Sequence, residues 1–123
     1  MRLVQVAQRA EDLERATTFY AQLLGAAPRA TYDPPGLVFF DLDGVRLLLE
    51  RGAPSALLYL AVDDIDAAVQ RLRAAGAPIR SEPHMIFAHA DDALGPAGTQ
   101  EWQAAVEDSE GNLVVLVEQR PAG

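Results

Sequence analysis

Two stretches of the chain share one pattern of apolar and polar positions. In each, a short apolar run leads into acidic residues, and a segment with apolar residues at helical spacing then ends at a glycine. The first stretch covers Gln5 to Gly25, and the second covers Leu57 to Gly76. Apolar residues three or four positions apart lie on one face of a helix, so each stretch predicts a strand followed by an amphipathic helix. The acidic residues suit the first helical turn, where they meet the positive end of the helix dipole.

Shorter apolar runs and turn signals fill the rest of both halves. The Asp-Gly pair in Asp41–Gly44 predicts a hairpin, because these two residues accept the positive φ angles of a tight turn. A polar segment from His89 to Thr99 predicts a loop, and the chain from Gln119 onward is expected to be frayed. The expected strands lie at 3–7, 30–32, 37–40, 45–50, 57–62, 78–86, 102–106 and 113–118. Each half therefore predicts the order βαβββ.

The repeat suggests one domain made of two modules. When Asp12 is aligned with Asp64, the second half is longer between its helix and its last turn. We assign residues 1–51 to the first module and residues 55–119 to the second, with a loop insertion near 87–99, and treat 1–123 as a single domain. Long polar loops often cover functional sites, although a surface insertion without a role is an equal alternative.

Composition narrows the class of protein. Half of the residues are apolar, which is enough for a packed core. The net charge is −8 and every basic residue is Arg, so the chain offers no basic stripe for nucleic acid or for an anionic membrane surface. There is no Cys, which excludes disulfides and thiolate ligands. No signal peptide or membrane-spanning run is evident, and a cytoplasmic protein is expected.

Three motifs carry a resemblance to a known family. They are Glu11 to Tyr20 with the following Leu-Leu-Gly25, Val62 to Val69, and Asp108 to Leu113. With these motifs the chain resembles the vicinal oxygen chelate superfamily, which includes glyoxalase I, bleomycin resistance proteins, methylmalonyl-CoA epimerase and extradiol dioxygenases. The resemblance implies an α+β fold in which paired βαβββ modules form an open, eight-stranded, cup-shaped barrel with the helices outside. It also implies a homodimer.

In metal-using members of this superfamily, the ligands stand at four positions on inner strand faces. The corresponding residues here are Gln5, Leu48, Leu57 and Val115, and Gln5 alone among them can bind a metal. Glu50 lies on the same strand face as Leu48, but two ligands are too few for a tight catalytic site. We therefore expect no metal and no other cofactor.

Strand alternation from these positions predicts a mostly apolar inner face, which suits a small-molecule pocket or a filled barrel. Gln5 is expected either to bind a ligand or to pair with Tyr59 or Arg46. Glu50 is either a general base or a solvated strand end, and Tyr59 and Trp102 either stack on a ligand or lie in the core. His84 and His89 lie near the insertion, where they could form an alternative metal site with Asp91 and Asp92, but their loop placement favours solvated side chains. The candidate ligand-binding residues are Gln5, Arg46, Leu48, Glu50, Leu57, Tyr59, His84, Trp102 and Val115.

Three functions fit these residues. The first is a metal-independent protein that binds or sequesters a small organic ligand, as bleomycin resistance proteins do, in a cavity bounded by Gln5, Tyr59 and Trp102. The second is a lyase, isomerase or epimerase of the glyoxalase or methylmalonyl-CoA epimerase kind, with Ni, Zn, Co or Mn held by Gln5, Glu50 and His84. The third is an interaction module with a filled barrel. Catalytic residues are not assigned by the sequence.

Overall fold

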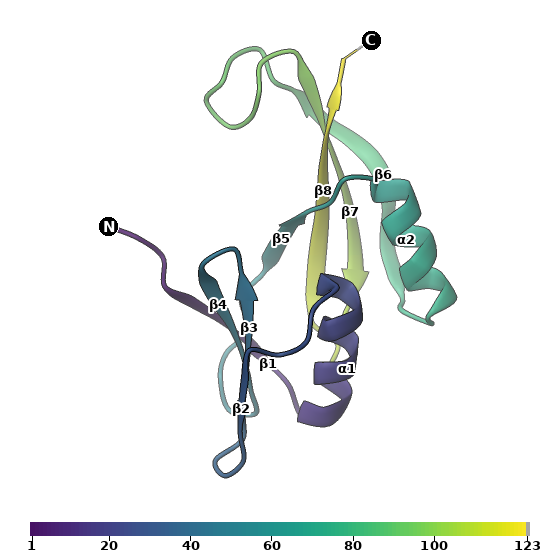
Figure 1. The fold of residues 1–123 in the computed structure, drawn as a ribbon. Helices are drawn as coiled ribbons and strands as arrows, with labels where there is room; N and C mark the ends of the chain where they lie inside the picture. Colours follow the sequence, from purple (N-terminus) through teal and green to yellow (C-terminus); the bar gives the residue numbers. More distant parts are fainter. Residues whose placement is uncertain (123) are drawn as a thin grey trace. The chain divides into compact units, whose positions relative to one another are not determined.

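The computed structural model describes residues 1–122, which form two compact units (Figure 1). The first unit contains Met1–Ala56 together with the turn Asp108–Asn112. The second unit contains Leu57–Glu107 and the chain from Leu113 onward. Each unit has one four-stranded sheet and one helix.

The first unit has the strand order β1-β4-β3-β2. Strand β1 runs parallel to β4, and the other neighbours are antiparallel. The order along the chain is βαβββ, as the sequence predicts. Its elements are β1 (Gln5–Arg9), α1 (Leu13–Leu24), β2 (Ala30–Tyr32), β3 (Leu37–Leu42) and β4 (Val45–Glu50).

Local chemistry fixes both ends of α1. The Asp12 side chain accepts a 3.0 Å hydrogen bond from the backbone N–H of Arg15, which satisfies one free donor of the first turn. Gly25 ends the helix in the left-handed conformation, with φ 68°. The buried face of α1 packs on β3 and β4. The buried residues in these three elements are Leu13, Ala16, Tyr20, Val38, Phe40, Leu47, Leu48 and Leu49.

The predicted hairpin between β3 and β4 is confirmed. Asp43 and Gly44 both have positive φ angles, 51° and 94°, as a two-residue turn with the twist of the strands requires. The Asp41 side chain accepts a 3.1 Å hydrogen bond from the backbone N–H of Gly44. This turn sets the register in which Asp41 lies opposite Arg46.

The second unit repeats the arrangement with longer strands. Its strand order is β5-β8-β7-β6, with β5 parallel to β8. Asp64 caps α2 as Asp12 caps α1, by accepting a 3.0 Å hydrogen bond from the N–H of Ala67. The elements are β5 (Leu58–Ala61), α2 (Ile65–Ala74), β6 (Ile79–Ala88), β7 (Thr99–Glu107) and β8 (Leu113–Pro121). The α+β class and the paired βαβββ modules are therefore confirmed.

Several details of the sequence prediction at strand and chain ends are wrong, including the expected start of a strand at Leu57 and the expected loop position of Thr99. Leu3 and Val4 lie before the first strand and are exposed. The chain is not frayed as far as Pro121, because Pro121 pairs with Thr99, the first residue of β7. Both β7 and β8 therefore extend beyond the expected bounds. Residue 123, also predicted to be frayed, lies outside the described residues.

A buried polar network holds the turn Asp108–Asn112 against the rest of the first unit. The Tyr20 hydroxyl donates to a carboxylate oxygen of Asp108 over 2.6 Å, and the Gln8 amide donates to the Tyr20 hydroxyl over 3.1 Å. Asn112 donates to the backbone carbonyl of Arg9 over 2.7 Å. Three segments distant in sequence are thus joined through side chains.

No helix among residues 1–122 combines the length and the apolar character needed to cross a membrane.

Candidate ligand-binding site

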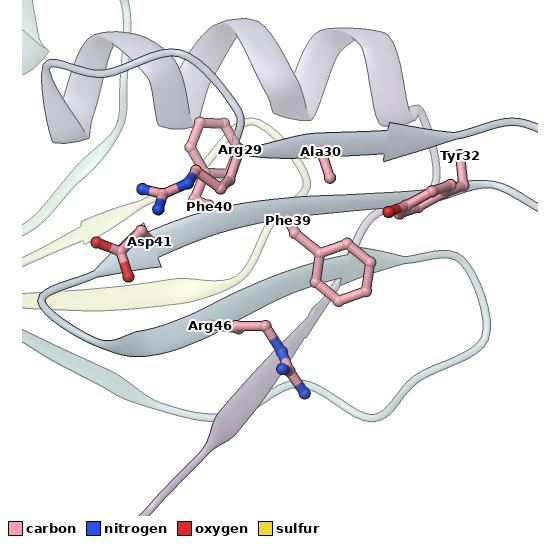
Figure 2. Close-up of a pocket in the computed structure, with 7 residues that line it drawn as sticks. All are labelled: Arg29, Ala30, Tyr32, Phe39, Phe40, Asp41 and Arg46. Atoms are coloured by element: carbon pink, nitrogen blue, oxygen red, sulfur yellow. The ribbon is translucent and has the colours of Figure 1, made fainter.

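A pocket lies on the face of the first sheet that α1 leaves uncovered (Figure 2). Its volume is about 410 Å³. Aromatic and charged side chains line it together, and they come from β2, β3, β4 and the residue just before β2. The lining residues are Arg29, Ala30, Tyr32, Phe39, Phe40, Asp41 and Arg46.

Strand alternation separates most of the pocket side chains from the core, whereas Phe40 belongs both to the pocket lining and to the core. Phe40 and Leu47 are fully buried on the side of α1, so Phe39 and Arg46 point to the opposite face. Tyr32 and Phe39 meet edge to face there, with ring centroids 6.1 Å apart and planes at 77°. This is a favourable aromatic geometry, and it leaves much of the Tyr32 side chain exposed.

Gln5 sets the position of the Arg46 side chain. The Nε–H of Arg46 donates a 2.8 Å hydrogen bond to the side-chain carbonyl of Gln5, its neighbour on β1. Asp41 is the neighbour of Arg46 on the other side, yet it forms no ion pair with Arg46. The guanidinium therefore lies beside a neutral amide, and within residues 1–122 it is not paired with a carboxylate.

Four of the sequence-predicted residues lie in the first unit. Arg46 lines the pocket, and Gln5 reaches it through Arg46. Leu48 lies on the same face, opposite Phe39, but is nearly buried. Glu50 is half-buried at the end of β4, between Arg9 and Leu37. Of the alternatives for Gln5, pairing with Arg46 is the arrangement present.

In the second unit, Tyr59 and Trp102 do not share a face. Tyr59 lies opposite Val115, and its side chain is 58% exposed. Trp102 lies opposite Glu118, two residues along β7 from the buried Ala104, and so on the side that α2 covers. The Arg120 guanidinium lies 4.3 Å from the Trp102 ring centroid, which is a cation–π contact. The prediction of a cavity with both Tyr59 and Trp102 in its wall is therefore wrong.

Leu57 and Val115 complete the predicted residues near Tyr59. Leu57 precedes β5 and is 50% exposed, whereas Val115 is nearly buried. Neither side chain carries an atom that can bind a metal or donate a hydrogen bond. These positions provide apolar surface only.

The two histidines differ in environment. His84 is exposed on β6, and its Nδ1 lies 2.8 Å from the backbone carbonyl of Glu82. His89 was expected in solvent, but its side chain is only 2% exposed, and its Nε2 lies 3.0 Å from a carboxylate oxygen of Glu101. The loop after β6 folds back over His89, with Gly95 against the ring. The expectation of a solvated His89 is wrong because this carboxylate satisfies the buried imidazole.

The residues at the superfamily's metal positions do not fit a metal ion. Leu48, Leu57 and Val115 have no donor atoms, and the carbonyl oxygen of Gln5 accepts a hydrogen bond from a cationic side chain. Residues 1–122 contain no group of three His, Cys, Asp or Glu side chains placed to hold a metal.

Sequence reasoning missed six of the seven residues that line the pocket. They are Arg29, Ala30, Tyr32, Phe39, Phe40 and Asp41. A signal for two of them was present, because the Asp-Gly turn places Asp41 opposite Arg46 and Phe39 opposite Leu48. Strand alternation carried across this hairpin from β4 to β3 places both side chains on the face of Arg46 and Leu48. The pairing of β2 with β3, which brings Tyr32 to Phe39, had no comparable signal.

Comparison with protein families decides the assignment. The model of the Glyoxalase/Bleomycin resistance protein/Dioxygenase superfamily matches residues 2–116. The chain belongs to this superfamily. The resemblance carried by the three sequence motifs is therefore confirmed. A search of curated proteins gave no match.

Several solved structures have a similar fold. A glyoxalase-related enzyme from Fulvimarina pelagi has a TM-score of 0.71 at 18% identity, covering 96% of this chain and 88% of that one. A glyoxalase/bleomycin resistance protein from Albidiferax ferrireducens T118 has a TM-score of 0.68 at 21% identity, covering 94% and 98%. A protein from the mobile metagenome of V. Pseudocholerae has a TM-score of 0.72 at 19% identity, covering 96% and 94%. At these identities the likeness concerns the fold.

Proposed function

We propose that the protein binds a small organic molecule in the pocket of its first module, without a divalent metal, and holds it without chemical change. The pocket on the open face of the first sheet is the observation that carries this proposal. Its volume of about 410 Å³ and its few polar groups around aromatic surface are typical of small-molecule sites.

The residue types at the superfamily's metal positions support the metal-independent part. Catalysis in metal-using members depends on a divalent ion that stabilises an anionic intermediate. Leu48, Leu57 and Val115 offer such an ion no ligand. The lining of the pocket is also poor in groups that could move a proton near neutral pH, since it has no His.

Three naphthalene probes test the binding: naphthoate, naphthamide and naphthylmethylamine, which share one ring system and differ in charge. Each is titrated into the purified protein while backbone amide chemical shifts are recorded. We expect at least one probe to shift the amides of residues around Phe39 in a saturable way. If no probe shifts them at accessible concentrations, the proposal is overturned.

Two exposed tyrosines give a matched pair of variants. Tyr32 lies in the pocket and is 54% exposed, and Tyr59 lies in the second unit and is 58% exposed. We expect Tyr32→Ser to weaken probe binding and Tyr59→Ser to leave it unchanged. The reverse result would move the site to the second unit and overturn the assignment of this pocket.

Metal analysis tests the other half of the proposal. We expect purified protein to contain no stoichiometric Ni, Zn, Co or Mn by mass spectrometry, and these ions to leave its melting temperature unchanged. A metal bound at one equivalent per chain, with activity lost on chelation, would establish the enzyme hypothesis instead.

A further inference from the structure

We infer that the ligand of this pocket is a planar organic anion, with its ring against Tyr32 and Phe39 and its negative group on the Arg46 guanidinium. This inference rests on the proposed function, because it names the class of molecule that the same site would take.

The aromatic pair selects a flat ligand. Tyr32 and Phe39 make an edge-to-face contact on the exposed side of the sheet, so ring surface of both residues faces the pocket. Ala30 has the smallest side chain in the pocket lining, and it lies opposite Phe39 in the strand pairing. A planar molecule can occupy the space over this small residue with its face on the phenylalanine.

The state of Arg46 selects a negative charge. Its guanidinium has two neighbours on adjacent strands, the amide of Gln5 and the carboxylate of Asp41, and it hydrogen-bonds to the amide. The bond uses the Nε–H, and within residues 1–122 the terminal N–H groups of Arg46 donate no hydrogen bond to another protein group. A guanidinium held at Nε presents its terminal donors to a carboxylate in good geometry.

Asp41 does not cancel this charge. Its carboxylate accepts a hydrogen bond from the backbone N–H of Gly44 and belongs to the hairpin turn. Figure 2 shows Arg29 and Asp41 toward one end of the pocket and Tyr32 toward the other, with Phe39 between them. In the described part of the chain, neither Arg29 nor Arg46 forms an ion pair, so the pocket has two cationic groups against one carboxylate.

The local charge is opposite to that of the whole chain. A protein with net charge −8 disfavours an anionic ligand at most of its surface. An anion that binds here would therefore depend on the pocket arginines, and raising the ionic strength would weaken its binding.

The three probes distinguish this inference from the proposed function. We expect naphthoate to bind about tenfold more tightly than naphthamide, the ratio that one charge-assisted hydrogen bond of about 1.4 kcal/mol supplies. We expect naphthylmethylamine to bind more weakly than both. If the amide binds as tightly as the carboxylate, or if the amine binds most tightly, the pocket binds small molecules but the anion is wrong. If none of the three binds, the proposed function itself fails.

Variants of exposed residues locate the charge effect. Arg46→Gln should abolish the preference for naphthoate over naphthamide, because it should weaken naphthoate binding more than naphthamide binding. Arg71→Gln removes one positive charge on α2, outside the pocket, and should leave the preference intact. An equal loss in both variants would show that net charge alone is responsible, which would overturn the inference.

Two variants of Gln5 keep the Arg46 guanidinium and change its hydrogen-bond partner. Gln5→Glu places a carboxylate beside Arg46, and it should remove most of the preference for naphthoate because the guanidinium is then paired. Gln5→Ala should weaken naphthoate binding less than Arg46→Gln, because the charge remains but its position is lost. If Gln5→Glu leaves the preference unchanged, Arg46 is not the group that binds the anion.

Discussion

The hydroxyl of Tyr20 donates a 2.6 Å hydrogen bond to the Asp108 carboxylate, which joins the first helix to a turn near the other end of the chain. Both side chains are buried, and the same hydroxyl accepts a hydrogen bond from the buried amide of Gln8. Burial and the bond to Asp108 raise the pKa of Tyr20 well above its usual value, so the phenol stays protonated. The superfamily motifs that contain Tyr20 and Asp108 thus have a structural role in this chain.

Tyr20→Phe should lower the free energy of unfolding by about 1–3 kcal/mol, the cost of leaving buried polar groups without partners. The substitution removes the partner of the Gln8 NH2 group and one donor to Asp108, and the side-chain carbonyl oxygen of Gln8 already has no partner within the described residues. Urea denaturation followed by circular dichroism measures the change.

Tyr32→Phe is the control for this prediction, because the hydroxyl of Tyr32 is on an exposed side chain and makes no hydrogen bond in the described chain. It should change stability by less than about 0.5 kcal/mol. If the two variants are equally stable, the Tyr20 hydroxyl does not hold the turn.

Low pH should weaken a second interaction between α1 and the turn Asp108–Asn112, the ion pair of Arg15 with Glu110. Arg15 donates to Glu110 at 2.7 Å and 3.1 Å, and these hydrogen bonds, with one from the backbone N–H of Asp12, hold the pKa of Glu110 at about 2. Because the folded pKa lies below the ordinary value of 4.5, the stabilisation is complete above pH 4.5 and disappears as the pH falls toward 2.

Glu110→Gln should therefore destabilise the protein by about 1 kcal/mol at pH 7, a value kept small because Arg15 is half-exposed. The difference from the unmodified protein should shrink between pH 4.5 and pH 2. Urea denaturation at a series of pH values measures it. A difference that stays constant with pH would show that the ionised carboxylate is not responsible.

The order of the elements was predictable because capping and turn residues act locally. Asp12 and Asp64 favour two helix starts, and the Asp43-Gly44 turn favours a hairpin, through contacts and backbone angles within a few residues. Strand ends were less predictable, since the pairing of Pro121 with Thr99 depends on a partner strand. The place of Tyr32 in the pocket and the burial of His89 were also not predictable. Their neighbours, Phe39 and Glu101, come from other strands that meet them only after folding.

The hairpin prediction can be tested with a pair of glycines. Gly44 has φ 94° and nothing within 4 Å of an added Cβ, so Gly44→Ala should cost about 1 kcal/mol through backbone strain alone. Gly52 has no positive φ and only a 3.8 Å contact there, so Gly52→Ala should be neutral or slightly stabilising. Denaturation curves for both variants measure the contrast, and equal stabilities would contradict the assigned turn.

The loop after β6 provides a prediction about packing. A Cβ on Gly95 would lie 2.8 Å from Cε1 of His89 and 2.7 Å from Nε2 of Gln119. The glutamine side chain can move, but the buried His89 ring is held by Glu101 and by an edge contact with Phe87. Gly95→Ala should therefore displace the loop and cost about 1–3 kcal/mol, as overpacking of a buried contact does.

Hydrogen exchange tells this local effect from a global one. In Gly95→Ala the amides of His89 and Gly98, which are hydrogen-bonded across the base of the loop, should exchange faster than in the unmodified protein. The amide of Gly44 lies in the hairpin of the first unit. Its exchange rate should change no more than the change in the free energy of unfolding of the whole protein explains. The double variant Gly95→Ala with Gln119→Ala should recover little of the loss, since the fixed His89 ring is the limiting contact. Full recovery would show that Gln119 alone excludes the side chain, and that His89 does not hold the loop.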